Sequence, residues 1–446
     1  MTSVQHQDTG LEIEVNSRQR EKSSRQPAVT PVTVLMLLTN SYDPDPRVRQ
    51  EALSLRAMGY HVRLLAWDRD GKSPTAEMME GIQVERVHLP SSHGRGTTQI
   101  FFYLAVYLKL IVQAWRISFD IIHCHDLDTL PLGFLVGRLK RKPVVYDAHE
   151  NFVGMLAGNV HPWVCRALTW IEDSLIARVD LLITVGEKLR QSFVARGARR
   201  TAVVGNWKSL KDYQRTEEQN QELRRKLGVP GNALVITCIT QLLKNRMIGE
   251  LVEAARAFPE VYVVLAGKGA MEEQVRKWAA QEPRIIYPGF LHASEVPAYT
   301  CASDVIYCGF DLTNPNAAFA APNKLFEALA AGKPLITPDV GEIGDLVRRA
   351  NCGEVLPEMS VSALREAINL ARDPYIRAVW TRNAQDLGRR EMNWDKGHAV
   401  LKEEYAHLHP KGKLSEPETS GHDQADLTAR EQSWSDDRLT SRCEKS

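Results

Sequence analysis

The chain has 446 residues, of which 43% are hydrophobic and 25% are charged, a composition typical of a folded globular protein and not of a fibrous or wholly disordered one. Its length predicts more than one domain. The 56 basic and 55 acidic side chains leave a formal net charge of +1, so the chain as a whole has no field to attract nucleic acid or an anionic membrane. Any anion must therefore be bound by local groups.

The two ends of the chain differ in composition from its middle. Residues 1–30 and 411–446 are charged, rich in serine and poor in aliphatic side chains, which predicts two disordered tails without chemistry of their own. The first tail lacks the apolar run of a signal peptide. The seven cysteines are scattered, with no Cys-x-x-Cys pair. We therefore predict a cytoplasmic protein in a reducing compartment, with no metal site.

Between the tails, short apolar runs alternate with amphipathic segments, a pattern typical of βα units around a parallel sheet. The first series occupies residues 31–205. Its predicted strands are residues 32–39, 61–66, 121–123, 144–147 and 181–185, and its predicted helices include residues 48–58 and 168–177. The sequence thus predicts a first Rossmann-like domain.

The most apolar stretch of the chain, residues 100–115 (IFFYLAVYLKLIVQAW), lies within this first series. It contains one charge, Lys109, and is shorter than the ~20 residues that a membrane-spanning helix needs. Such a helix either packs in the core or lies on a membrane surface with one apolar face inserted. A peripheral contact with the inner membrane face therefore stays open.

A second series of the same kind occupies residues 206–390. Its predicted strands are residues 234–239, 261–266, 285–287, 304–307 and 334–337, and its predicted helices are residues 248–258, 271–280 and 324–331. Residues 391–410 form a further predicted helix that packs back towards the first domain. Two doubly wound sheets side by side leave a cleft, and ligands of such sheets bind beyond the carboxyl ends of the strands.

The exit of the first strand, residues 40–49 (NSYDPDPRVR), is a proline-stiffened turn that leads into a helix. Asp45 is placed to cap that helix, and capping alone would explain it. Arg47 and Arg49 near the helix start would also suit an anionic acceptor or a diphosphate. Both interpretations remain open from the sequence.

Two neighbouring strand exits in the first half are rich in titratable groups. Residues 120–128 (DIIHCHDLD) include His123, His125 and Asp126, but strand alternation sends the two histidines to one side and Asp126 to the other, which disfavours a metal site. His125 beside a carboxylate could orient a substrate hydroxyl. In the next exit, residues 146–150 (YDAHE), His149 and Glu150 could line a cleft wall, or the loop could be purely structural.

The second half offers three further candidates at strand exits. Lys244 and Arg246 stand before a helix, where backbone amides favour a phosphate. Gly267 and Gly269 could let the backbone approach a ligand closely, although such a pair is as often a plain turn. Residues 314–334 (NPNAAFAAPNKLFEALAAGKP) predict a helix whose first turns carry the remaining candidates, Asn323, Lys324 and Glu327.

Taken together, these segments resemble the family 4 retaining glycosyltransferases. The resemblance covers residues 32–408 and rests on residues 45–48 (DPRV), His125, residues 146–150, residues 322–334 and Asn393-Trp394. It implies the GT-B fold, in which two Rossmann-like domains face each other across a cleft. It also implies transfer, with retention, of a sugar from a nucleotide diphosphate sugar, which acts as co-substrate, and no other cofactor. The acceptor would be an unknown sugar or lipid-linked molecule in polysaccharide or glycoconjugate synthesis.

The resemblance implies roles for the candidate residues. Glu327 would hold the donor ribose, and Asn323 and Lys324 would meet the diphosphate. Arg246 would neutralise the leaving phosphate, which is the electrostatic part of catalysis. His125 would position the reacting sugar. The first domain would shape the acceptor pocket through the loop residues Arg47, His149 and Glu150, and Asp45 beside them is a further candidate for substrate binding.

The chain departs from the family pattern at two positions. Phe319 stands where a second glutamate is common, and Gln241 stands where arginine is common. Asn314 or Asn316 could contact the sugar in place of the missing acid. Two alternatives follow: a protein that binds a nucleotide sugar without turnover, or a nucleotide-sugar epimerase that needs no separate acceptor pocket.

Overall fold

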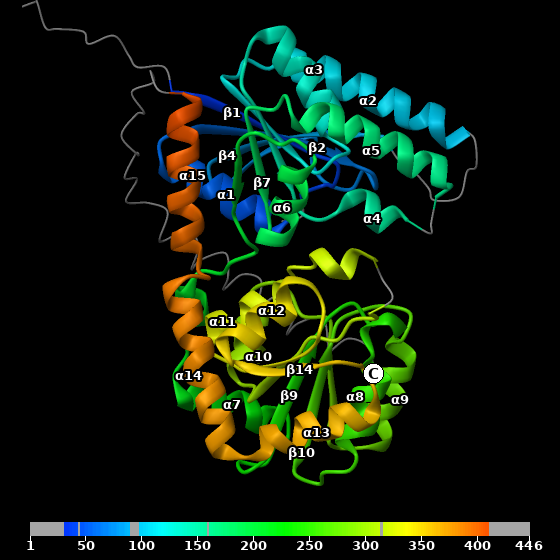
Figure 1. Cartoon of the computed structure of the whole chain (residues 1–446), viewed down its shortest axis with the longest axis vertical. Helices are drawn as coiled ribbons and strands as arrows, with labels where there is room; N and C mark the ends of the chain where they lie inside the picture. The colour runs from blue at the N-terminus through cyan, green and yellow to red at the C-terminus, as the bar shows by residue number, and fades with distance from the viewer. Residues whose placement is uncertain (1–30, 43–44, 90–97, 158–159, 313–314, 410–446) are drawn as a thin grey trace, which may run out of the picture.

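The computed structural model describes residues 31–42, 45–89, 98–157, 160–312 and 315–409, and the two predicted tails lie outside these residues. The described chain forms two α/β domains, one above the other in Figure 1. Each domain is a mostly parallel sheet covered by helices on both faces. The predicted fold class is therefore confirmed.

The sheet of the first domain has eight strands in the order β3-β4-β2-β1-β5-β6-β7-β8, and all of its neighbours are parallel except the pair of β3 and β4. The strands are β1 (Thr33–Leu38), β2 (His61–Asp68), β3 (Ala76–Met79), β4 (Ile82–His88), β5 (Ile121–His125), β6 (Val144–Ala148), β7 (Leu181–Thr184) and β8 (Thr201–Val203). The five predicted strands are all present. Sequence analysis did not find β3, β4 and β8, because they are short or alternate with polar residues.

Alternating residues of β1 divide the first domain into two apolar layers. Leu35 and Leu37 face one layer of helices, whereas Val34 and Met36 face the other. The first layer contains α2 (Thr98–Arg116), α3 (Leu130–Lys140), α4 (Phe152–Leu156), α5 (Pro162–Ile176) and α6 (Glu187–Ala195). The second contains α1 (Pro46–Ala57) and, from the far end of the chain, α15 (Trp394–Leu408).

The predicted helix at residues 100–115 is part of α2, which packs against the sheet through Val106, Leu110 and Ala114. The interpretation as a core helix is thus correct for one face of α2. Within the described residues, no helix combines the length and the apolar character needed to cross a bilayer.

The second sheet has six parallel strands in the order β11-β10-β9-β12-β13-β14. They are β9 (Leu234–Ile239), β10 (Val261–Ala266), β11 (Ile285–Gly289), β12 (Val305–Tyr307), β13 (Leu335–Pro338) and β14 (Gly353–Leu356). The helices are α7 (Glu217–Lys226), α8 (Ile248–Ala255), α9 (Glu272–Gln281), α10 (Val296–Cys301), α11 (Asn323–Ala331), α12 (Gly341–Ala350), α13 (Val361–Arg372) and α14 (Pro374–Arg390). Three 3-10 turns are η1 (Leu210–Tyr213), η2 (Lys244–Arg246) and η3 (Pro315–Phe319).

The last helix of the described residues, α15, leaves the second domain and lies along the first (Figure 1). The Trp394 indole donates a hydrogen bond of 2.9 Å to the Ser54 hydroxyl of α1. The Tyr405 hydroxyl shares a hydrogen bond of 2.6 Å with His123 Nδ1 at the centre of the first sheet, and both side chains are fully buried. The end of the chain therefore ties the two domains together.

We expect the Tyr405 contact to contribute measurably to stability. Tyr405→Phe keeps the packing of the ring but leaves His123 Nδ1 without its partner, which should cost about 1–3 kcal/mol. Tyr405→Ala also opens a cavity and should cost about 3–5 kcal/mol. Urea unfolding measures both, with the 78% exposed Tyr375 of α14 as control. Equal stability of Tyr405→Phe and Tyr375→Phe would contradict this role.

Candidate functional site

A cavity of about 430 Å³ lies between the two domains, at the carboxyl ends of several strands. The first domain contributes residues that follow β6, and the second contributes residues that follow β9 and β12 together with the start of α11. The lining consists of His149, Glu150, Asn206, Ile239, Thr240, Gln241, Asn245, Arg246, Phe310, Asp311, Ala317, Phe319, Ala320, Ala321, Pro322, Asn323, Lys324 and Glu327.

Behind the first-domain wall lies a buried ion network centred on Asp147. The Arg47 guanidinium donates two hydrogen bonds to the Asp147 carboxylate, of 2.6 and 3.1 Å, and a third of 2.7 Å to the Val204 carbonyl. It also pairs with Glu51 at 3.0 Å. Burial would raise the pKa of Asp147, but Arg47 and His149 outweigh it and hold that pKa well below its usual range. Asp147 is therefore a buried anion.

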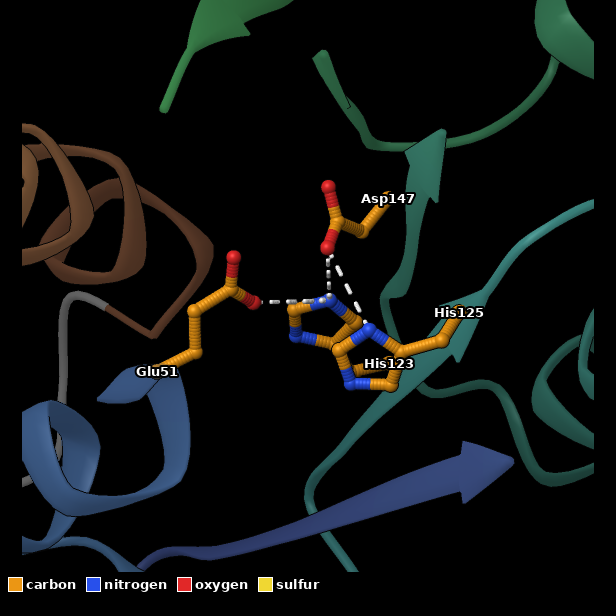
Figure 2. A group of neighbouring side chains, drawn as sticks. All are labelled: Glu51, His123, His125 and Asp147. Atoms are coloured by element: carbon orange, nitrogen blue, oxygen red, sulfur yellow. Dashed lines mark hydrogen bonds and ion pairs between the residues drawn. The ribbon is translucent and has the colours of Figure 1, made fainter. Parts of the chain in front are cut away.

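Two histidines of β5 stack beside this network. The rings of His123 and His125 lie 4.3 Å apart, which confirms that the two side chains share one side of the strand. Figure 2 shows both rings turned towards the Asp147 carboxylate, with Glu51 approaching His123 from α1. Burial lowers the pKa of each histidine, so both are neutral at neutral pH.

His149 connects the buried network to the cavity. Its Nε2 lies 2.8 Å from an Asp147 oxygen, its Nδ1 lies 3.4 Å from Asp126, and its side chain is 18% exposed. Burial alone would lower its pKa, but Asp126 and Asp147 raise it to about 10. The first-domain wall therefore presents an imidazolium to the cavity at neutral pH.

The network could also be considered as a metal site. One ligand atom from each of Glu51, His123, His125 and Asp147 lies within 4.8 Å of the others. Arg47 already supplies a positive charge to both carboxylates, and burial raises the pKa of Glu51 so that it favours the neutral form. The positive charge of Arg47 thus already offsets the negative charge of Asp147. Asp126 of the predicted cluster contacts His149 instead of the stacked histidines.

The second-domain wall brings two cations towards the cavity. Arg246 lies in η2, and its guanidinium rests 5.2 Å from the centre of the Phe310 ring, which follows β12. Lys324 lies in the first turn of α11, and its ammonium donates a hydrogen bond of 3.0 Å to the Thr240 hydroxyl at the exit of β9. Elements that are separate in the sequence thus place both cations on one wall.

The start of α11 is open to a ligand. Pro322 is its N-cap residue, and no side chain of the described residues caps this end. The free backbone amides of a first helical turn favour an anion. Glu327 stands one turn further along α11 and also lines the cavity. Lys208 of the segment between the domains donates a hydrogen bond of 2.8 Å to the Asn323 side chain.

Two models of known protein families match the chain. The model described as "Glycosyl transferase 4-like domain" matches residues 44–207, and "Glycosyl transferases group 1" matches residues 219–386. The two matches fall on the first and second domains and meet near the segment between them.

The chain belongs to the GT-B glycosyltransferases.

Two curated relatives illustrate the family at low identity. The alpha-monoglucosyldiacylglycerol synthase of Acholeplasma laidlawii is 22% identical over 304 residues, 64% of this chain and 75% of that protein. The phosphatidyl-myo-inositol mannosyltransferase of Mycobacterium leprae is 23% identical over 368 residues, 80% of this chain and 91% of that protein.

Solved structures share the fold. Sucrose-phosphate synthase from Thermosynechococcus elongatus has a TM-score of 0.68 and 18% identity, and the match covers 85% of this chain and 99% of that one. The Anabaena protein HepE in complex with UDP has a TM-score of 0.63 and 19% identity, over 84% of this chain and 100% of that one. At this identity, the two matches show the architecture of the glycosyltransferase and nothing finer.

Several predicted residues of the glycosyltransferase do not line the cavity. Asp45 caps α1, accepting hydrogen bonds from the backbone amides of Arg47 and Val48, so the capping interpretation is confirmed. The Arg47 guanidinium is turned inwards, bonded to Asp147 and Val204, and lies outside the cavity lining, so its contact with an anionic ligand stays a prediction that this geometry does not support. His125 is buried behind His149.

The two glycines after β10 serve the backbone and not the cavity. A Cβ on Gly267 would lie 1.8 Å from the Thr240 carbonyl oxygen, and one on Gly269 would lie 2.5 Å from the Leu242 carbonyl oxygen. Both have positive φ, +136° and +155°. The sequence predicted that a ligand approaches the backbone of these glycines. In the structure, the loop after β9 approaches it instead, and only glycine leaves room for that contact.

The other predicted residues are placed as follows. Lys244 is exposed and lies outside the cavity lining, unlike its neighbour Arg246. Asn314 lies outside the described residues, and of Asn316 the structure describes the backbone in η3. Sequence analysis missed Glu51 and Thr240, because a mid-helix acid and a threonine carry no motif of their own.

The raised pKa of His149 predicts how stability depends on pH. Folding favours the protonated imidazole of His149. The stabilisation that it adds to the folded state is therefore complete below the ordinary pKa of about 6.5 and is lost as pH rises towards about 10. Unfolding free energy should fall across this window by up to about 1.4 kcal/mol per pH unit. His149→Gln should flatten the fall, whereas His407→Gln at an exposed position of α15 should not. The same slope in all three proteins would contradict the assignment.

Proposed function

We propose that the enzyme binds a nucleoside diphosphate sugar against the second-domain wall of the cavity and transfers the sugar to an acceptor held by the first-domain wall. The observation that carries this proposal is the grouping of Arg246, Lys324 and the uncapped start of α11 on one wall. Together they provide two cations and a set of backbone amides, which suits a diphosphate.

Glu327 brings a carboxylate, an acceptor of hydrogen bonds, to this wall. It follows the diphosphate site by one turn of α11, so it is placed to bind the two ribose hydroxyls of a nucleotide whose phosphates meet the helix start. A carboxylate oxygen accepts from a hydroxyl in a charge-assisted hydrogen bond, which is shorter and stronger than a neutral one. Arg246 then stabilises the negative charge that develops on the leaving diphosphate.

The first-domain wall supplies the acceptor side. His149 brings a positive charge to the rim of the cavity and Glu150 a carboxylate, so the wall offers both a donor and an acceptor of hydrogen bonds. His125 is neutral and buried behind His149, which suits the positioning of the reacting sugar through its neighbour. We propose that transfer proceeds with retention at the anomeric carbon.

The names of similar proteins support this proposal. HepE structures contain UDP and UDP-glucose, and two relatives are named as a monoglucosyldiacylglycerol synthase and a phosphatidyl-myo-inositol mannosyltransferase. A role in the synthesis of a glycoconjugate follows from this family, and a sugar or a lipid-linked sugar is the proposed acceptor. The base and the sugar of the donor are left to experiment.

A thermal-shift screen against UDP, GDP, ADP and their common sugars tests the donor site. A ligand that binds the folded state raises the melting temperature by mass action. One nucleotide should raise it for the wild type, and Glu327→Ala should abolish that rise. Glu273→Ala, at an 83% exposed glutamate of α9, is the matched control and should respond as the wild type does. A shift that survives in Glu327→Ala would place the nucleotide elsewhere.

Arg246 and Lys244 form a second matched pair, since both are cations of η2 but only Arg246 lines the cavity. Arg246→Ala should lower kcat by about 10²–10³, the usual loss when one group that stabilises developing charge is removed. Lys244→Ala should change it by less than about twofold, because that side chain is exposed. Equal losses would show that the diphosphate lies closer to η2 than we propose.

Analysis of the products separates this proposal from its alternatives. An epimerase would convert the nucleotide sugar without any acceptor, and a binding protein would give no product at all. A transferase gives a glycosylated acceptor and free nucleoside diphosphate. NMR of the new glycosidic bond then compares its anomeric configuration with that of the donor, and inversion would contradict the proposed stereochemistry.

A further inference from the structure

The outer side of one helical layer in the first domain is unusually apolar. The layer consists of α2, α3 and α5, where α2 packs beside α3 and α3 beside α5 (Figure 1). Its inner side packs on the sheet, so its outer side faces solvent. We call this outer side the apolar face. Its exposed large apolar residues are Leu108, Val112, Trp115, Leu135, Leu139, Trp163 and Trp170.

The exposed residues of α2 form a regular stripe. Leu108, Val112 and Trp115 are spaced by four and three residues, so they share one side of the helix. The residues that pack on the sheet, such as Leu110 and Ala114, lie on the other side. Helix α2 therefore has two apolar sides, and folding of the domain accounts for one of them.

The apolar face also carries exposed tryptophans on α5. Trp170 is 70% exposed and Trp163 is 59% exposed, whereas a surface helix of a globular protein normally turns polar residues to solvent. Exposed large apolar side chains gathered on neighbouring helices mark an interaction surface. Tryptophan in particular is enriched where a protein meets the boundary of a lipid bilayer and water.

The charge on this layer that is not in ion pairs is positive. Helices α2 and α3 contain no acidic residue, and Lys109, Arg116 and Arg166 are exposed on the layer. None of these three cations forms an ion pair with a residue that the structure describes. Helix α5 contains two acids, Glu172 and Asp173, and both are bonded to Arg196. The layer is thus basic in a chain whose net charge is +1.

We infer that the apolar face docks on the surface of a membrane that contains anionic phospholipid. Apolar side chains would enter the boundary of the acyl region while the cations meet the lipid phosphates, which is how amphipathic surfaces bind bilayers. A second copy of the chain fits less well, because a symmetric contact between two such faces would bring like charges together.

This orientation would place the bilayer near the cavity. Helix α4 and helix α5 directly follow the cavity residues His149 and Glu150 in the chain, and α4 contacts η3 of the second domain. Met155 of α4 is itself exposed. An acceptor anchored in the bilayer would then reach the cavity along the first-domain wall, a consequence that also rests on the proposed function.

Flotation of the full chain with vesicles tests the inference. We expect binding to vesicles of phosphatidylcholine with phosphatidylglycerol, weaker binding to phosphatidylcholine alone, and release by salt. The triple variant Lys109→Glu, Arg116→Glu, Arg166→Glu should bind the anionic vesicles at least about 100-fold more weakly, since each cation near such a surface contributes about fivefold. Trp163→Ala with Trp170→Ala should lower binding to both kinds of vesicle.

Matched variants lie on the second domain, at exposed positions of α7 and α9. Lys226→Glu, Arg276→Glu and Lys277→Glu change the net charge equally and should leave binding to vesicles unchanged. Equal loss in both triple variants, or equal binding to neutral and anionic vesicles, would overturn the inference. So would a dimer of the wild type in sedimentation that the tryptophan variant abolishes, because the face would then be a protein interface.

The donor site and the apolar face can fail separately. Glu327→Ala should float with anionic vesicles as the wild type does, and the triple variant of the apolar face should keep its melting temperature and its thermal shift with nucleotide. A wild-type protein that binds anionic vesicles but shows no thermal shift with any nucleotide would therefore count against the proposed function alone.

Discussion

The buried pair of Arg47 and Asp147 is the interaction on which the first-domain wall depends. Arg47 comes from the start of α1, Asp147 from the end of β6, and the third hydrogen bond of the guanidinium reaches the backbone just after β8. A buried carboxylate without a partner is strongly destabilising, so the pair fixes where these three elements meet. The histidines of β5 and of the loop after β6 then take their positions around the same carboxylate.

This arrangement explains how a nearly neutral chain can offer a strongly charged site. Asp147 remains an anion because Arg47 and His149 surround it, and the same anion keeps His149 protonated. The charge that reaches the cavity from the first domain is therefore generated by groups that are themselves buried. The second-domain wall adds Arg246 and Lys324. In a partly closed cleft such charges are screened less than on an open surface.

The sequence predicted the fold and the strand exits because their signals are local. Buried parallel strands are continuous apolar runs, and the polar residues after them mark the carboxyl edge of a sheet. It could not show that Arg47 turns inwards, because its partner Asp147 is far away in the chain. Nor could it distinguish a glycine that approaches a ligand from one that approaches a carbonyl, as Gly267 does. Nor could the sequence show which apolar side of α2 is exposed, because this depends on which side the sheet covers in the folded domain.

The two walls of the cavity are not independent, because the segment between the domains contacts the donor side directly. Asn206 donates a hydrogen bond of 2.9 Å to the Ala321 carbonyl, and Lys208 bonds to the side chain of Asn323 at the start of α11. A second contact joins the two domains elsewhere: the Lys188 ammonium of α6 lies 2.6 Å from the Asp345 carboxylate of α12. A change in the angle between the domains must therefore strain or break contacts with the first turn of α11. Closure of the cleft and the geometry of the proposed diphosphate site are thus coupled through backbone and side-chain hydrogen bonds that the structure already contains.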